Sequence, residues 1–299
     1  MLFRSRLPQV RVRSRFRRAR ATSVILRGKL GPMRRDSRIY IAGHEGAIGA
    51  AITQRLRREG SSQLLLAPRT HLDLREARAV DDWFATHRPE YVLCAAGVVG
   101  GIQTNAAGDP ALVRDNQLIQ SAVLAAAHRH RVRKLLYLGC GCMYPRNCPQ
   151  PIKEEYLLTG PLEPTSEAYA RTKLAGVQLC HEYRRQHGCN YIVAIPSNVY
   201  GAAHRDDSAR MHVVSALAHR FQRARAARQQ AVDVWGSGTA RRDFVHVDDV
   251  ANACVFLMDR YDDLSPVNIG SGESTSIATL AETIRDLVYP GATVRFDVS

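Results

Sequence analysis

The sequence predicts an α/β protein in which a doubly wound parallel sheet carries a smaller C-terminal α/β domain. Short apolar runs alternate with helix-period stretches from residue 38 to about residue 200. Strands that alternate with helices of this length form right-handed βαβ units on a parallel sheet. After residue 200 the alternation weakens and loop-like segments separate shorter elements, which indicates a second domain built against the carboxyl edge of the sheet.

The elements of the sheet follow one another in a regular order. We expect strands where short runs rich in strand formers occur, at residues 38–43, 63–68, 91–97, 134–139 and 191–201. We expect helices where apolar residues recur at helical spacing, at residues 47–60, 73–89, 109–131 and 166–188. The second helix should stop at Pro89, because proline disfavours a helical conformation in the residue before it.

The net charge of +14 raises the question of nucleic-acid binding. Residues 1–35 hold eleven Arg and one Lys and no acidic residue, so this tail carries +12 and the remaining 264 residues carry about +2. A body this close to neutral is unlike a surface that follows phosphates. We expect no nucleic-acid partner and a disordered tail, which is either a transit peptide or an extension upstream of Met33 that adds nothing to the fold.

Two further properties bear on the compartment. No uncharged apolar stretch reaches the roughly 18 residues that a membrane span needs, so we expect no membrane partner. Seven cysteines are an odd number in a chain without a secretory signal. This predicts free thiols in a reducing compartment rather than a disulfide framework.

A glycine-rich turn, IYIAGHEGAIG, follows the first strand directly. Glycine at such a turn lets the backbone approach a pyrophosphate, and the helix that follows offers its N-terminal N–H groups to the anion. The turn therefore predicts a Rossmann-type dinucleotide site formed by Gly43, Gly46, Ala47, Ile48 and Gly49. A turn that is merely tight is the alternative.

Arg69 lies at the end of the second strand. Many dinucleotide sites carry an acidic residue at this place, which binds the ribose 2′-hydroxyl. A guanidinium group suits a 2′-phosphate instead, so we expect NADP (NADPH) as the cofactor. The alternative is a solvated surface arginine.

Two thiols, Cys140 and Cys142, end the strand in KLLYLGCGCMYP. A metal site is disfavoured, because no second Cys or His pair stands at the spacing of a closed tetrahedral set, so we expect no metal. A redox pair is disfavoured, because the spacing is not Cys-x-x-Cys. Catalytic thiols and inert thiols both remain open from these residues alone.

Tyr169 and Lys173 in YARTK are four residues apart on the fourth expected helix. This spacing places both side chains on one face of the helix. Lys173 could then lower the pKa of the Tyr169 phenol. The combination predicts a catalytic pair, although a pair of surface residues has the same spacing.

Four stretches carry a resemblance to a known family: AGHEGAIG, YPRNCPQPIKEEYLLTGPLEPTSEAYARTKLAG, IPSNVYG and VWGSGTARRDFVHVDDV. They resemble the extended branch of the short-chain dehydrogenase/reductase superfamily and, within it, the GDP-L-fucose synthase family. The similarity runs from about residue 38 to 297. It implies an NADPH-dependent oxidoreductase and epimerase that converts GDP-4-keto-6-deoxy-D-mannose to GDP-L-fucose. It also implies a cytoplasmic homodimer formed through two helices near residues 110–130 and 168–187.

The resemblance implies roles for individual residues. Tyr169 protonates the 4-oxygen while NADPH delivers hydride, and Lys173 holds the nicotinamide ribose. Cys142 and His212 fall on the acid and base that epimerise two sugar carbons, and Cys140 falls on a serine that hydrogen-bonds the reacting carbonyl. The stretch 95–102 resembles the loop after the family's fourth strand, which lies along the cofactor. The resemblance therefore adds Ala95, Ala96 and Pro196 to the cofactor site. The substrate residues implied are Asn198, Arg220, Trp235 and Arg242.

The same resemblance suggests a division of the chain. Residues 36–198 form the NADP-binding domain, to which residues 240–262 return. Residues 199–239 and 263–299 form the substrate-binding domain. The family continues past FDVS, so we expect this domain to be truncated at its C-terminus.

Two substitutions separate this chain from the family pattern. Cys140 replaces the serine, and a thiol is the weaker hydrogen-bond donor. Glu45 replaces an arginine of the glycine loop that helps to bind the 2′-phosphate. With the short C-terminus, these changes leave two alternatives open: a catalytically impaired, cofactor-binding relic of the family, or another nucleotide-sugar epimerase of the same branch.

Overall fold

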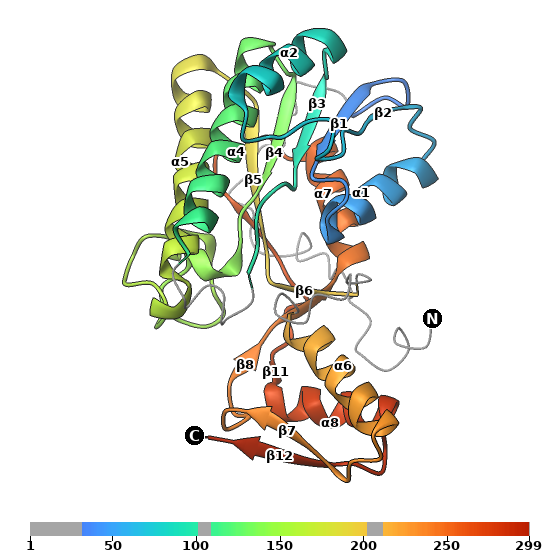
Figure 1. The fold of residues 1–299 in the computed structure, drawn as a ribbon. Coiled ribbons are helices and arrows are strands. Elements are labelled where there is room, and N and C mark those ends of the chain that lie inside the picture. The colour runs from blue at the N-terminus through green and yellow to red at the C-terminus, as the bar shows by residue number, and fades with distance from the viewer. Residues whose placement is uncertain (1–31, 101–108, 202–211, 299) are drawn as a thin grey trace.

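The computed structural model describes residues 32–100, 109–201 and 212–298. Figure 1 shows a large lobe, in which helices cover both faces of a sheet, and a small lobe built mainly from the C-terminal part of the chain. The greater part of the expected tail, residues 1–31, lies outside the described residues. So do residues 101–102 of the stretch expected to follow the cofactor.

The large lobe is organised by a six-stranded sheet with the strand order β10-β5-β4-β3-β1-β2. All neighbouring strands in it are parallel. The chain winds outward from β1 in one direction to β2 and in the other direction to β3, which makes the β1 edge a topological switch point. The strands are β1 (Arg38–Ala42), β2 (Gln63–Leu65), β3 (Tyr91–Cys94), β4 (Lys134–Leu138), β5 (Tyr191–Pro196) and β10 (Val267–Ile269).

Helices cover both faces of this sheet, so the central strands are apolar throughout. One face packs against α2 (Ala77–His87), α4 (Pro110–Arg129) and α5 (Glu167–His187). The other face packs against α1 (Ala47–Arg58) and α7 (Val247–Arg260). Successive strand residues serve the two cores in turn: Tyr137 lies in the first and Leu136 in the second.

The small lobe has its own core around Phe221, Val234 and Leu280. Two helices, α6 and α8, pack on a parallel pair of strands, β7 and β12. Two further pairs connect the lobes: β6 with β9 in parallel, and β8 with β11 in antiparallel orientation. The bounds are β6 (Asn198–Tyr200), α6 (Val213–Ala226), β7 (Ala231–Trp235), β8 (Arg241–Arg242), β9 (Phe244–His246), β11 (Thr275–Ser276), α8 (Ile277–Val288) and β12 (Thr293–Asp297).

The predicted fold class is confirmed, with differences at element boundaries. The second expected helix begins at Ala77 rather than residue 73. The expected strand 191–201 divides at Ser197 into β5, which joins the large sheet, and β6, which pairs with β9. The short strand β10 belongs to the large sheet, whereas the division drawn at residue 263 gave it to the substrate domain. Three residues show too little periodicity to identify such a strand from sequence.

No helix in the described residues is long and apolar enough to cross a bilayer. The described ranges also contain the 3₁₀ turns η2 (Gly141–Met143), η3 (Glu154–Tyr156) and η4 (Pro164–Ser166). The turn η2 follows β4 and packs against α5, which positions the two thiols.

Candidate active site

The expected site residues gather at the carboxyl edge of the large sheet. Because the strands are parallel, their carboxyl ends meet at one edge. Gly43 follows β1, Ala95 follows β3, Cys140 follows β4 after one residue, and Pro196 ends β5. The fold therefore brings together residues that lie more than 150 positions apart in the chain.

The glycine turn is tightly packed. Gly43 has φ +82°, and a Cβ there would lie 2.7 Å from the Cα of Ala96. A Cβ on Gly49 would lie 2.1 Å from the carbonyl oxygen of Gly43. Both positions require glycine, because the turn, helix α1 and the loop after β3 approach one another at backbone distance.

Helix α1 begins at this turn with Gly46 as its N-cap, and no side chain caps it in the described part of the chain. Its first N–H groups and the positive end of its dipole are thus available to an anion. Gly46, Ala47 and Ile48 lie at the place where a dinucleotide's pyrophosphate would be held. These residues fit such a cofactor.

Glu45 and Arg69 lie together at the edge of this turn. The Glu45 carboxylate accepts a hydrogen bond from the backbone N–H of Arg69 at 3.2 Å, and both residues are exposed. A group bound by the Arg69 guanidinium would therefore lie near a carboxylate. This contact matters for a 2′-phosphate, which carries negative charge.

The loop that was expected to lie along the cofactor follows β3, the third strand in chain order, not a fourth strand. Ala95 donates its backbone N–H to Ala42 at 3.0 Å. Asn116 of α4 accepts from the Val98 N–H at 2.9 Å and donates to the Val98 carbonyl at 2.8 Å. Asn116 is buried and also donates to the Leu112 carbonyl at 2.8 Å, so α4 fixes the position of this loop.

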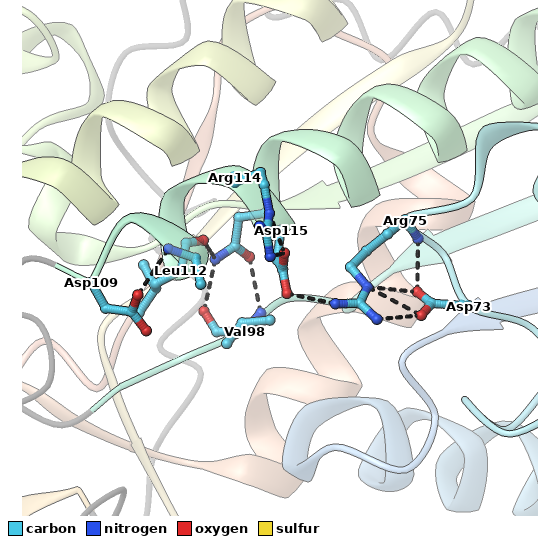
Figure 2. Close-up of polar contacts among 9 residues, drawn as sticks. Asp73, Arg75, Val98, Asp109, Leu112, Arg114 and Asp115 are labelled. Carbon is cyan, nitrogen blue, oxygen red and sulfur yellow. Dashed lines mark hydrogen bonds and ion pairs between the residues drawn. The ribbon is translucent and has the colours of Figure 1, made fainter.

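A chain of ion pairs lies along the same helix, α4 (Figure 2). Arg75 contacts the Asp73 carboxylate at 2.5 Å and the Asp115 carboxylate at 2.9 Å, and Arg114 contacts Asp115 at 2.9 Å. The pKa of Asp73 is lowered to about 2, mainly by its hydrogen bond to Arg75. The chain joins the segment after β2 to helix α4.

Tyr169 and Lys173 lie on α5 with 9% and 6% of their surfaces exposed. The Lys173 ammonium lies 4.5 Å from the centre of the Tyr137 ring. Tyr137 donates its hydroxyl to Gln120 at 2.8 Å, and a Cβ on Gly176 would lie only 2.3 Å from that hydroxyl oxygen. Gly176 therefore lets α5 approach β4 closely enough to bring both side chains to the edge of the sheet.

Cys140 and Cys142 face each other. Their sulfurs lie 2.8 Å apart, and both side chains are half-buried. Cys140 continues the extended backbone of β4, with φ −153° and ψ 155°, before the chain turns into η2. This change from strand to 3₁₀ turn brings Cys140 and Cys142 to the same side of the chain.

The contact gives the two thiols different acidities. The hydrogen bond from Cys142 is the main cause that lowers the pKa of the Cys140 thiol, and the positive charge of Lys173 adds to it. The same hydrogen bond and burial raise the pKa of the Cys142 thiol. Two sulfurs this close cannot both ionise readily, so the first proton to leave exposes a thiolate on Cys140.

Tyr169 differs from its expected state. Burial raises the pKa of the Tyr169 phenol well above its usual value, and negative charge on Cys140 and Cys142 adds to the effect. Burial lowers the pKa of the Lys173 ammonium, and the charge on Cys140 opposes this. The expected lowering of the Tyr169 pKa by Lys173 is therefore not seen.

The expected substrate residues lie toward the small lobe. Asn198 in β6 donates its amide to the Asp243 carbonyl at 2.9 Å. Arg220 on α6 donates to the Asp233 carbonyl at 3.0 Å. Trp235 ends β7 and is 64% exposed, and Arg242 in β8 is exposed. His212 is the exposed N-cap of α6.

Sequence reasoning missed Asp243, which connects three segments. Its carboxylate accepts from the Ser197 hydroxyl at 3.2 Å, from the Ser271 N–H at 2.9 Å and hydroxyl at 2.8 Å, and from the Gly272 N–H at 3.0 Å. In the sequence, Asp243 could have been identified by its position between Arg242 and an apolar run. From the sequence, only the basic residues of this segment were considered.

The NAD dependent epimerase/dehydratase family matches residues 39–270. The putative GDP-L-fucose synthase 2 of Arabidopsis thaliana is 44% identical over 256 residues, which cover 86% of this chain and 78% of the relative. The GDP-L-fucose synthase of Escherichia coli K12 is 41% identical over 271 residues, which cover 88% and 84%.

Solved structures agree. The GDP-mannoheptose C4 reductase from Campylobacter jejuni, with NADP bound, is 32% identical with a TM-score of 0.82, over 89% of this chain and 88% of that one. A GDP-L-fucose synthetase from Naegleria fowleri bound to NADP is 26% identical with a TM-score of 0.81, over 89% and 82%. Sequence and fold lead to one conclusion: the chain belongs to the NAD dependent epimerase/dehydratase family and, within it, to the GDP-L-fucose synthases.

Proposed function

We propose that this protein is an NADPH-dependent oxidoreductase and epimerase that converts GDP-4-keto-6-deoxy-D-mannose to GDP-L-fucose. The observation that carries the proposal is the convergence of three features at one sheet edge: the glycine turn before α1, the Tyr169–Lys173 pair, and the Cys140–Cys142 thiol pair. The membership in the GDP-L-fucose synthase family supplies the substrate class.

Epimerisation needs a base and an acid near carbons that flank a ketone. Protons on such carbons are acidic enough for a thiolate or an imidazole to remove them. One sulfur of the thiol pair would accept a proton from the sugar and return it. His212 would supply or take the proton on the opposite face of the ring, and Cys142 is the sulfur assigned to face the sugar.

Reduction of the 4-keto group needs a proton donor. NADPH supplies hydride when it is bound. The neutral Tyr169 phenol would donate its proton to the 4-oxygen, and the raised pKa of that phenol keeps the proton in place until the oxygen becomes basic. Lys173 would hold the nicotinamide ribose, and Cys140 would lie beside the carbonyl as the residue that replaces the family's serine.

The remaining roles follow from the same assignment. Gly43, Gly46, Ala47, Ile48 and Gly49 would hold the pyrophosphate of NADPH. Arg69 would bind the 2′-phosphate, and the segments containing Ala95, Ala96 and Pro196 would line the dinucleotide. The GDP part would be bound by polar and aromatic groups of the small lobe, namely Asn198, Arg220, Trp235 and Arg242.

We further propose a homodimer in the cytoplasm. Helices α4 and α5 pack side by side on one face of the large lobe. Leu118, in the middle of α4, is 44% exposed, which suits a contact with a second copy. All seven cysteines are free thiols, as expected in a reducing compartment.

The proposal is tested by mixing the purified chain with NADPH and GDP-4-keto-6-deoxy-D-mannose and following absorbance of the reduced nicotinamide. We expect absorbance to fall as GDP-L-fucose forms. In deuterated water, the product should carry deuterium at both epimerised carbons, and Cys142→Ser should abolish this uptake while cofactor binding persists.

Other outcomes separate the alternatives. Binding of NADPH without turnover would identify a cofactor-binding relic, which the Ser-to-Cys replacement at Cys140 would favour. Reduction without deuterium uptake would identify a C4 reductase of another GDP-keto sugar. That reading has support in the similarity to the GDP-mannoheptose C4 reductase.

A further inference from the structure

The contact between Cys140 and Cys142 is the one sulfur–sulfur contact among the seven cysteines, all of which lie in described parts of the chain. Cys94, Cys180 and Cys254 are buried in the two cores of the large lobe. The proposed epimerisation uses one sulfur as an acid and base, and nothing in that chemistry requires two sulfurs within 2.8 Å. The proposed reaction therefore does not explain why the two sulfurs lie in contact.

The geometry is close to that of a disulfide. A disulfide joins its sulfurs at about 2.05 Å, so the two atoms need to approach by roughly 0.8 Å. The residue between them is Gly141, which is exposed and has only the Pro196 carbonyl oxygen, at 3.9 Å, near the place of a Cβ. The backbone has room to adjust at this point.

The pair is also partly exposed, and the groups around it favour a thiolate on Cys140. Both side chains are half-buried at the end of β4, where Cys140 packs against the edge of the first core. The Cys142 thiol and the charge of Lys173 favour a thiolate on Cys140. Thiolate is the form of cysteine that reacts with oxidants, and a second thiol at contact distance can complete the reaction.

We propose that Cys140 and Cys142 form a reversible oxidation site whose substrate is hydrogen peroxide and whose product is a Cys140–Cys142 disulfide. The Cys140 thiolate attacks one peroxide oxygen, the O–O bond breaks, and hydroxide leaves, which takes up a proton to become water. The resulting Cys140 sulfenic acid is attacked by the Cys142 sulfur, and a second water leaves as the S–S bond forms. Two thiols lose two electrons and two protons in total, and the peroxide is reduced to two waters.

The disulfide has a defined consequence, which rests on the proposed function. It removes both the thiolate and the thiol proton, so the centre loses its sulfur acid and base. The glycine turn, Tyr169 and Lys173 are not altered chemically. Epimerisation should stop while NADPH still binds, and a dithiol should restore activity.

The experiment uses the full chain, reduced with dithiothreitol, freed of it and treated with a small excess of hydrogen peroxide. Peptide mass spectrometry should show the peptide containing both cysteines lighter by about 2 Da, as a disulfide requires, with both thiols protected from iodoacetamide. Turnover should fall at least tenfold and recover with dithiothreitol. NADPH affinity should change less than twofold.

Two variants sharpen the test. Cys142→Ala should stop at a Cys140 sulfenic acid that dimedone captures, with no disulfide formed. The control Cys189→Ser removes another half-buried thiol, one that contacts His128 at 3.3 Å, and should still form the disulfide. Persistence of both thiols, pairing of either with a different cysteine, or irreversible oxidation of Cys140 to a sulfinic acid would each overturn the proposal.

The two proposals fail in different ways. Disulfide formation is read from mass and does not depend on turnover, so a chain that forms it but never consumes NADPH would disprove only the proposed function. A chain that turns over before and after peroxide treatment, with both thiols intact, would disprove only the oxidation site.

Discussion

At the scale of single residues, the thiol of Cys140 gives the centre a chemistry that a hydroxyl would not. A hydroxyl donates a hydrogen bond well and does not ionise near neutral pH, whereas a thiol donates weakly and ionises readily. Here the Cys142 thiol and Lys173 favour that ionisation. Burial is the main cause that raises the pKa of the Tyr169 phenol, and negative charge on the nearby sulfurs adds to the effect.

The acidity of Cys140 should depend on its neighbour. The hydrogen bond from Cys142 is the largest cause of the lowered pKa, so Cys142→Ala should raise the pKa of the Cys140 thiol. The midpoint of the pH dependence of Cys140 alkylation by iodoacetamide, followed by peptide mass, should move to higher pH. Cys148→Ala, which removes a thiol elsewhere, should leave the midpoint unchanged. An unmoved midpoint in Cys142→Ala would show that the contact does not set the acidity.

Glu45 should weaken NADPH binding, because its carboxylate lies against the backbone of Arg69. Replacing it by arginine removes a repulsive charge and adds a second guanidinium for the 2′-phosphate. We expect Glu45→Arg to tighten NADPH about tenfold, or about 1.4 kcal/mol, with little effect on NADH. Fluorescence titration with both cofactors measures this. Glu282→Arg, an equal charge change on the exposed side of α8, is the control, and equal tightening of NADH would remove the 2′-phosphate from the explanation.

At the scale of elements, buried polar groups hold helices against the sheet. Lys134 begins β4 with only 3% of its surface exposed. Its ammonium donates to the carbonyls of Leu257, Met258 and Tyr261 at 2.9, 2.6 and 2.5 Å. These carbonyls end α7, where the helix leaves acceptors without internal partners, so one strand residue caps the helix that packs behind it.

This cap should make stability depend on pH. Burial lowers the pKa of the Lys134 ammonium from 10.5 to about 8. Between pH 8 and pH 10.5 the unfolded chain holds more protons on this group than the folded chain does. The free energy of unfolding therefore increases as the pH rises through this range, by up to about 1.4 kcal/mol per pH unit. Urea unfolding at pH 8, 9 and 10 should show that the free energy of unfolding of wild type increases relative to that of Lys134→Met. The control is Lys153→Met, at an exposed position, whose free energy of unfolding should differ from that of wild type by the same amount at every pH. A pH-independent difference between wild type and Lys134→Met would contradict the prediction.

The sequence predicted the elements that follow simple periodicity and missed those that depend on contacts. The strands from β1 to β5 were found because helices cover both faces and make them apolar throughout. Strand β10 was missed because three residues carry no pattern. The Cys140–Cys142 contact was missed because it depends on a change from extended backbone to 3₁₀ turn, which residue spacing does not reveal. Asp243 was missed because its partners come from two segments far from it in the sequence.

At the scale of the whole molecule, the proposed cofactor and substrate residues fall in different lobes. The dinucleotide turn lies entirely in the large lobe, whereas Arg220, Trp235 and Arg242 lie in the small lobe. The chain passes between the lobes at β6 and β9, which pair with each other. Asp243 stands at this crossing, and its carboxylate ties the end of β5 to the segment after β10. A change at this residue should therefore affect the substrate more than the cofactor.

Asp243→Ala should reveal that separation. It leaves the Ser271 and Gly272 N–H groups without their acceptor and loosens the neighbouring Arg242, while the glycine turn before α1 keeps its contacts. We expect KM for the sugar nucleotide to rise about tenfold, or about 1.4 kcal/mol, with NADPH affinity within twofold of wild type. Steady-state kinetics and cofactor titration measure the two. Asp286→Ala, which removes an exposed ion pair with Arg285, should change neither, and Asp243→Asn should recover part of the loss because its amide retains one acceptor. An equal loss of NADPH affinity would mean that Asp243 supports the whole fold rather than the small lobe's approach to the substrate.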